Sequence, residues 1–276
     1  MKNRSIALIV RDSDFFNEYV KVWDEGAIKD APFITLGVEA ILKDYYGDLL
    51  DAPPPFPVEK HEKILDLGCG WGRVLKPVLD LQGDAVGLDI SHNMLGLSRK
   101  HLDKNGHNTP LLQGDGTRLP FRDNTFDKVY SLLVLQHLSK ENGKAVFSEI
   151  HRILKPGGTA YVRVPGRFAP ENLLFSFLQF ISIHLFRVKD PIRMRFYRVG
   201  EAKKITRKLF SDVTITAHEF RPPWNLHTKW TWQYILVPQF MHSRLRKISD
   251  WFEKKANGNV PFLKHFGVVL MVRVTK

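Results

Sequence analysis

Three glycines and a carboxylate stand close together in the stretch ILDLGCGWGR (64–73). Glycines between a strand and a helix let the backbone come close to a ligand. In proteins that bind dinucleotides, such a loop holds a pyrophosphate at the start of the helix. Here Asp66 stands two residues before Gly68, and its carboxylate would repel a pyrophosphate. The same carboxylate suits a ligand that carries an ammonium group.

Two further carboxylates follow later apolar runs of the same kind. Asp89 ends the run in VGLDIS, where a carboxylate can accept hydrogen bonds from both hydroxyls of a ribose. Asp115, in LLQGDGTRLPF, can accept the exocyclic amine of an adenine, with the backbone of Gly116 beside it. S-adenosylmethionine combines these groups with an α-amino group and a sulfonium, and it has no phosphate. The three acids therefore favour S-adenosylmethionine over a dinucleotide as the cofactor.

The elements that must position these side chains alternate between apolar strands and amphipathic helices. We predict strands within residues 63–69, 84–90, 109–115, 126–138, 159–165, 212–220 and 267–275. We predict helices at 72–82, 91–106 and 140–154, and a turn at KPGG (155–158). Ser91 is suited to cap the second of these helices. This alternation predicts an α/β fold with a parallel sheet covered on both faces, whose strand carboxyl ends form the ligand-binding edge.

The motifs ILDLGCGWGR, VGLDIS, GDGTRLPF, FDKVYSLLVLQHL and EIHRILKPGGTAYV, in this order, resemble the class I S-adenosylmethionine-dependent methyltransferases, in particular their type 11 small-molecule group. The resemblance covers about residues 60–165. It implies a Rossmann-like, doubly wound sheet of seven strands with the last strand antiparallel. It also implies a division of the chain into an N-terminal helical lid and linker (1–60), a cofactor-binding core (61–165), a helical and basic insertion (166–210) and a C-terminal part that completes the core (211–276).

The resemblance assigns roles to individual residues of the core. Asp66 and the loop Gly68, Cys69, Gly70 and Gly72 would surround the methionine part of S-adenosylmethionine. Asp89 and Ile90 would hold and cover the ribose, Met94 would flank the adenine, Asp115 and Gly116 would meet its edge, and Leu132 would lie under the cofactor. Tyr19 and Trp23 would belong to a lid over it, although such an aromatic stripe also suits an ordinary core.

The segment after the predicted fourth strand narrows the class of acceptor. It reads SLLVLQH (131–137) and has neither the [DN]-P-P-[YFW] pattern of adenine N-methylation nor carboxylates for a magnesium ion. Pro222-Pro223-Trp224 lies far from this position. Cys69 sits in the glycine loop rather than where a cytosine C5 nucleophile is needed, and no metal site is expected. The best-placed proton acceptor is His137, although a structural role suits it as well. His218, His227 and Tyr197 are weaker candidates for the acceptor pocket.

The composition and charge of the chain limit the kinds of acceptor and partner that it can have. The chain has 276 residues, one cysteine, a formal net charge of +12 and no apolar run long enough for a transmembrane helix, which favours a cytoplasmic protein. The insertion joins an apolar stretch (173–186) to Arg187, Lys189, Arg193, Arg195 and Arg198. This pattern favours a small hydrophobic or amphiphilic acceptor whose O, N or C atom is methylated, and contact with a membrane surface. RNA methylation, a non-catalytic cofactor-binding partner subunit and oligomer formation stay open as alternatives.

Overall fold

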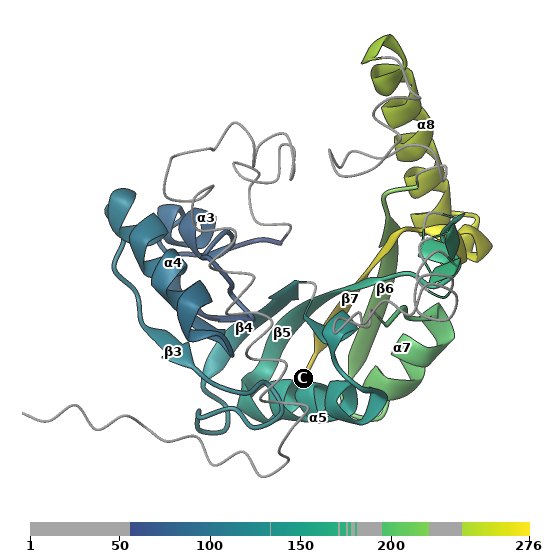
Figure 1. Cartoon of the computed structure of the whole chain (residues 1–276). Coiled ribbons are helices and arrows are strands. Elements are labelled where there is room, and N and C mark those ends of the chain that lie inside the picture. The colour runs from purple at the N-terminus through teal and green to yellow at the C-terminus, as the bar shows by residue number, and fades with distance from the viewer. Residues whose placement is uncertain are drawn as a thin grey trace, which may run out of the picture.

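The computed structural model of the chain describes residues 56–132, 134–170, 172–174, 176–177, 180, 195–220 and 239–276. Within them, seven strands form one sheet in the order β3-β2-β1-β4-β5-β7-β6 (Figure 1). The strands are β1 Lys63–Leu67, β2 Asp84–Asp89, β3 Leu111–Gln113, β4 Phe126–Leu132, β5 Leu154–Pro165, β6 Asp212–His218 and β7 Val269–Thr275. The helices are α3 Leu75–Asp80, α4 His92–Lys104, α5 Lys140–Ile153, α7 Val199–Thr206 and α8 Gln239–Asn257, with the 3-10 turns η2 Leu135–His137 and η4 Pro261–Phe266.

The strand directions follow the predicted arrangement. The pairs β1–β2, β1–β4, β2–β3 and β4–β5 are parallel, as crossover helices between them require. The last strand, β7, lies between β5 and β6 and runs antiparallel to both. The predicted seven-stranded, doubly wound sheet with an antiparallel last strand is therefore confirmed.

Alternate side chains of the strands build two separate cores. Ile64 and Tyr130 pack with residues of α3 and α4 on one face of the sheet. Leu65 and Val129, one position along, pack with residues of α5 and α7 on the other face. Successive side chains of a strand point to opposite faces, so a short apolar run feeds both cores at once. Both faces of the sheet are covered in this way.

Local signals fix the ends of several elements. Ser91 accepts a hydrogen bond from the backbone N–H of Met94 and caps α4, as predicted. The predicted KPGG turn is instead part of β5, which begins at Leu154. The register with β4 shifts between Phe126 and Lys128, and Gly157 has a positive φ of 77°. The two glycines bulge out of the strand without ending it, because the flanking residues continue to pair with β4.

The predicted lid at 1–60 lies almost wholly outside the described residues, as do Tyr19 and Trp23. Among the helices that the structure describes, none combines the length and the apolar character needed to cross a bilayer.

Candidate functional site

The glycine loop folds over the carboxyl end of β2. The backbone N–H groups of Gly68 and Cys69 both donate to the carbonyl oxygen of Leu88, at 2.7 and 3.1 Å. The N–H of Gly70 donates to Oδ2 of Asp89 at 2.8 Å. The loop between β1 and α3 is thereby tied to the end of the neighbouring strand, and it brings two of the three predicted acids into one site.

Two glycines of this loop are required by their surroundings. Gly68 has a φ of 76°, and a β-carbon there would lie 2.1 Å from Cγ2 of Val134, in the segment that follows β4. Gly72 has a φ of 86°, and its β-carbon would lie 2.6 Å from the Ser98 hydroxyl of α4. Positive φ and close approach both exclude larger residues. The loop is therefore held tightly between β4 and α4.

Asp66 is buried beneath this loop. Its side chain is 3% exposed, and Oδ2 accepts no hydrogen bond in the part of the chain that the structure describes. Burial raises the pKa of Asp66 to about 7, the charge of Asp89 adds to this rise, and the Arg73 guanidinium opposes it. A buried carboxylate without a hydrogen-bond donor is costly, so Asp66 is suited to receive a cationic ligand.

Asp89 lies at the end of β2 and is almost buried. Its Oδ1 accepts from the N–H of Ser91 at 2.9 Å, while Oδ2 accepts from Gly70. These backbone donors fix the orientation of the carboxylate at the sheet edge. Each carboxylate oxygen has more than one acceptor site, so this arrangement leaves capacity for ligand hydroxyls.

The third acid has a different local role. Both oxygens of Asp115 accept hydrogen bonds from Thr117, from its N–H at 2.8 Å and its hydroxyl at 2.6 Å. The carboxylate therefore closes the turn after β3, a role that the sequence analysis did not consider. The neighbouring Gly116 packs over Leu67, where a β-carbon would lie 3.3 Å from Cδ1.

The remaining predicted contacts surround the same edge. Met94 is buried in the first turn of α4, and Leu132 is half-buried at the end of β4. The carbonyl of Ile90 accepts from the Gln113 amide at 3.0 Å. Cys69 is buried, and burial together with the charges of Asp66 and Asp89 raises the pKa of its thiol well above its usual range. Such a thiol is a poor nucleophile.

His137 closes η2, which directly follows β4. Its Nε2 lies 3.0 Å from the amide nitrogen of Gln136. Burial lowers the pKa of His137 to about 4, so the imidazole is neutral at physiological pH but is a weak base.

The weaker acceptor-pocket candidates fall elsewhere. Tyr197 is a core residue whose hydroxyl donates to the carbonyl of Leu135 at 3.0 Å. His218 pairs with Glu253 of α8, on the far edge strand β6. His227 and Pro222-Pro223-Trp224 lie outside the described residues. Sequence reasoning did not anticipate Val134, Ser98 or Arg73 as neighbours of the glycine loop and Asp66, because only folding brings them there.

The core of the chain matches a known family. Residues 64–158 match the model of a methyltransferase domain. Over 99 residues the chain is 39% identical to a sterol 24-C-methyltransferase of Gibberella zeae, a match that covers 35% of this chain and 26% of that protein. Over 131 residues it is 34% identical to a demethylmenaquinone methyltransferase of Geobacillus stearothermophilus, a match that covers 45% of this chain and 55% of that protein. The matches thus span between about a quarter and about half of these curated relatives.

Solved structures resemble this chain over nearly its whole length. A possible histamine N-methyltransferase of Thermotoga maritima, described as S-adenosylmethionine-dependent, superposes with a TM-score of 0.58 at 17% identity and covers 93% of this chain and 99% of that one. A chain of the complex between the Haloferax volcanii Trm112 methyltransferase activator and a methyltransferase superposes with a TM-score of 0.57 at 23% identity, covering 96% and 98%. At these identities the similarity establishes the fold.

Proposed function

We infer that this chain, which carries a class I S-adenosylmethionine-dependent methyltransferase domain at residues 64–158, transfers a methyl group from that cofactor to a small acceptor. The observation that carries the proposal is the buried Asp66 carboxylate, whose Oδ2 meets no donor among the described residues. It lies beside a second oriented carboxylate, Asp89, and near a loop in which Gly68 and Gly72 have a positive φ and no room for a β-carbon. A cationic nucleoside without phosphate satisfies all three features.

The described residues fit S-adenosylmethionine part by part. Asp66 would accept the ammonium of the methionine moiety, and the backbone of the glycine loop would let that moiety approach closely. Asp89 would accept the ribose hydroxyls, with Ile90 covering the sugar. Met94 would lie against the adenine and Gly116 at its edge, while Asp115 would hold the turn that carries Gly116. Leu132 would lie under the cofactor, and Tyr19 and Trp23, outside the described residues, are proposed as lid residues over it.

When bound, the cofactor supplies an activated methyl group and its own leaving group. The contribution of the protein is therefore to orient the acceptor in line with the sulfonium and to exclude water from it. The buried edge around Asp66 and Leu132 suits this task. If the acceptor must lose a proton, we propose the neutral imidazole of His137, just past β4, as the group that takes it; its low pKa makes it a weak base, so the acceptor must itself be acidified in the site.

A hydrophobic or amphiphilic acceptor is favoured by two observations. The relatives named above are a sterol and a demethylmenaquinone methyltransferase. In addition, Leu173, Phe177 and Phe180, just beyond the core, are 48%, 59% and 59% exposed. Incubation of the full chain with methyl-labelled cofactor and quinol, sterol or phospholipid acceptors tests this choice, because label must appear in the lipid phase.

Replacement of Asp89 tests the ribose contact. We expect Asp89→Ala to weaken S-adenosylmethionine binding by about 100-fold, because two charge-assisted hydrogen bonds are lost together with the anchor of Gly70. Isothermal titration calorimetry measures this change. Asp84→Ala is the matched control, since Asp84 begins the same strand at the opposite edge and is exposed. Equal affinities of the two variants would contradict the ribose assignment.

Replacement of His137 tests proton transfer. We expect His137→Gln to lower the rate of methyl transfer by about 100-fold or more while the dissociation constant of the cofactor stays unchanged. Single-turnover kinetics with the acceptor found above, read beside calorimetry, separates the two quantities. An unchanged rate would leave His137 with a structural role only.

A further inference from the structure

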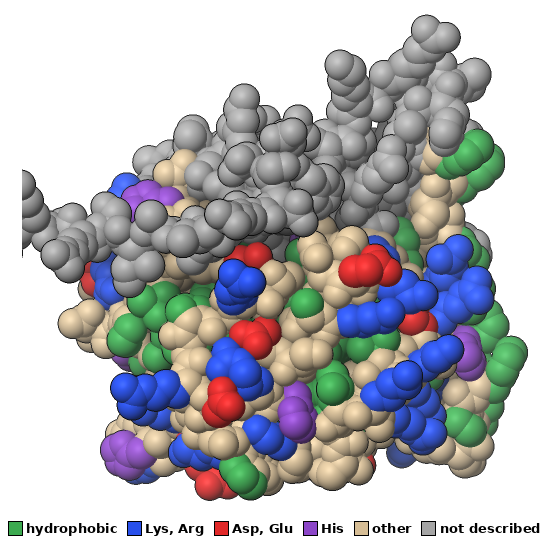
Figure 2. Space-filling model, turned by 90° about the horizontal axis from the view of Figure 1, so that it is seen from below, with side chains coloured by type: hydrophobic (Ala, Val, Ile, Leu, Met, Phe, Trp, Pro, Cys, Tyr) green, Lys and Arg blue, Asp and Glu red, His purple; other side chains and the backbone are tan. Residues whose placement is uncertain are grey.

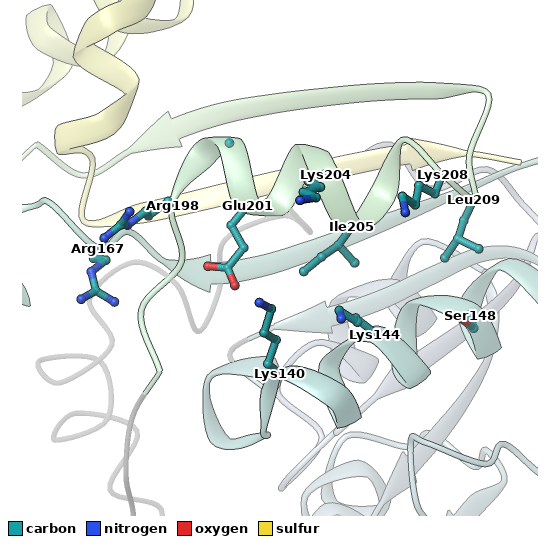
Figure 3. A pocket seen from close by; sticks show the side chains of 11 residues that line it. Lys140, Lys144, Ser148, Arg167, Arg198, Glu201, Lys204, Ile205, Lys208 and Leu209 are labelled. Atoms are coloured by element: carbon teal, nitrogen blue, oxygen red, sulfur yellow. The ribbon is translucent and has the colours of Figure 1, made fainter.

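A groove of about 750 Å³ runs between α5 and α7, on the face of the sheet opposite α3 and α4 (Figure 3). Its floor includes Ile205 and Leu209. Its walls carry six cationic side chains, which are Lys140, Lys144, Arg167, Arg198, Lys204 and Lys208. Figure 3 shows the lysines of α5 facing those of α7 across the groove, with both arginines at the end near the strand carboxyl ends. All six residues are exposed.

The single acid of the groove does not neutralise these charges. Glu201 forms an ion pair with Arg195, which stacks on the Tyr197 ring at 4.4 Å. None of the six cations pairs with an acidic side chain in the described ranges, whereas many other basic residues there, such as Lys76, Arg152 and Lys155, are paired. Like charges gathered in this way repel one another, so the groove is built for an anionic partner. Figure 2 shows lysine and arginine side chains gathered on one part of this face.

An exposed apolar stripe, formed by Leu173, Phe177 and Phe180, begins a few residues after Arg167, which lines the groove. Phe168, directly after Arg167, lies 5.4 Å under the Arg198 guanidinium. The helical residues that follow expose Leu173, Phe177 and Phe180. Their spacing of four and three residues places them on one helix face. Large apolar side chains exposed beside cations that meet no acidic partner among the described residues are the two components of an interfacial membrane site.

We propose that the α5–α7 groove and the stripe of Leu173, Phe177 and Phe180 form a docking surface for anionic phospholipid membranes. Lipid phosphates neutralise the six cations, and the apolar side chains enter the headgroup region. A phosphodiester chain of RNA would also account for the cations, and its bases could stack on Phe177 and Phe180. It would leave Leu173 in water, whereas a membrane receives all three exposed apolar side chains. Docking would bring the cofactor site to the surface where a lipid-like acceptor resides, and this last step alone rests on the proposed function.

Vesicle co-sedimentation of the full chain without cofactor tests the charged part of the surface. We expect binding to vesicles of phosphatidylserine and phosphatidylcholine and little binding to phosphatidylcholine alone. Lys144→Glu with Lys208→Glu should reduce the partition coefficient by about tenfold or more, since each basic residue near an anionic surface contributes to binding. Lys60→Glu with Lys100→Glu makes the same change in net charge at exposed positions outside the groove and should lower binding much less.

A second pair of variants tests the stripe. Leu173→Ser with Phe177→Ser should abolish the binding that persists at high salt, whereas Phe262→Ser, in a phenylalanine of η4 that is still more exposed, should not. Equal loss in groove and control variants, or equal binding to both kinds of vesicle, would overturn the proposal. So would salt-dependent retention of single-stranded RNA by the groove without vesicle binding. Calorimetry with S-adenosylmethionine is run in parallel, so failure of the proposed function is seen separately.

Discussion

The affinity of this chain for S-adenosylmethionine should rise with pH up to about 7, and Asp66→Asn should remove that dependence. The buried Asp66 has a pKa of about 7, so half of the unliganded protein carries a neutral carboxyl at that pH. Only the ionised form attracts the cofactor ammonium. We therefore expect about a twentyfold gain in affinity between about pH 5.5 and about pH 7.5. Calorimetric titrations across this range measure it directly.

The same group has the opposite effect on the stability of the unliganded protein. Folding raises the pKa of Asp66 from 3.8 to about 7. The contribution of Asp66 to the free energy of unfolding is therefore most favourable below pH 3.8, and it is lost as the pH rises to about 7. The difference corresponds to about 4 kcal/mol, an order-of-magnitude value for a buried group. Asp66→Asn should thus unfold at higher urea concentration than the parent at pH 7.5 while binding the cofactor about 100-fold more weakly.

Gain of stability together with loss of binding separates a ligand-binding acid from a structural one. If Asp66→Asn instead lost stability at pH 7.5, the attraction between Asp66 and Arg73 would outweigh the cost of burial. If its cofactor affinity matched that of the parent, the ammonium contact would be wrong. Asp84→Asn, at the exposed start of β2, provides the baseline for both measurements.

The predictable part of this fold is the part that depends on short-range pattern. Strand runs such as KILDL and DAVGLD, the Ser91 cap and the glycine loop each carry their signal within a few residues, and the structure has them where the pattern predicts. Asp66 and Asp89 are also predictable as neighbours, because they stand near the carboxyl ends of parallel strands that pair directly.

The features that sequence did not reveal depend on long-range packing. Arg198 of the predicted basic segment lines the groove, whereas Arg195 of that segment pairs with Glu201. The groove also takes Lys140 and Lys144 from α5, which no local pattern places beside that segment. Asp115 was assigned to adenine, but whether Thr117 would turn back to its carboxylate depends on local φ and ψ that composition does not specify. Tyr197 had the chemistry of a site residue, and only its burial against Leu135 identifies it as core.

Gly68→Ala should be the most damaging single-methyl change in the cofactor loop. The alanine must adopt a φ of 76° and place its methyl 2.1 Å from Cγ2 of Val134. The strained backbone costs about 1–2 kcal/mol, and overpacking adds about 1–3 kcal/mol. We expect a loss of about 2–5 kcal/mol in the free energy of unfolding, measured in urea. We also expect at least a tenfold weaker binding of S-adenosylmethionine, because the displaced loop no longer holds Gly70 against Asp89.

A double-mutant cycle separates the two causes. Val134→Ala removes Cγ2, the atom that the methyl of Gly68→Ala would strike, so Gly68→Ala should cost less in the Val134→Ala background, by about 1–3 kcal/mol. Gly70→Ala is the matched control: its φ is 52°, and among the described residues only its chain neighbours lie within 4 Å of the added methyl. That variant should lose only the backbone component, about 1–2 kcal/mol, and Val134→Ala should not restore it. Additive effects at Gly68 and Val134 would show that the loop does not depend on this contact, and that the glycine is required for its backbone conformation alone.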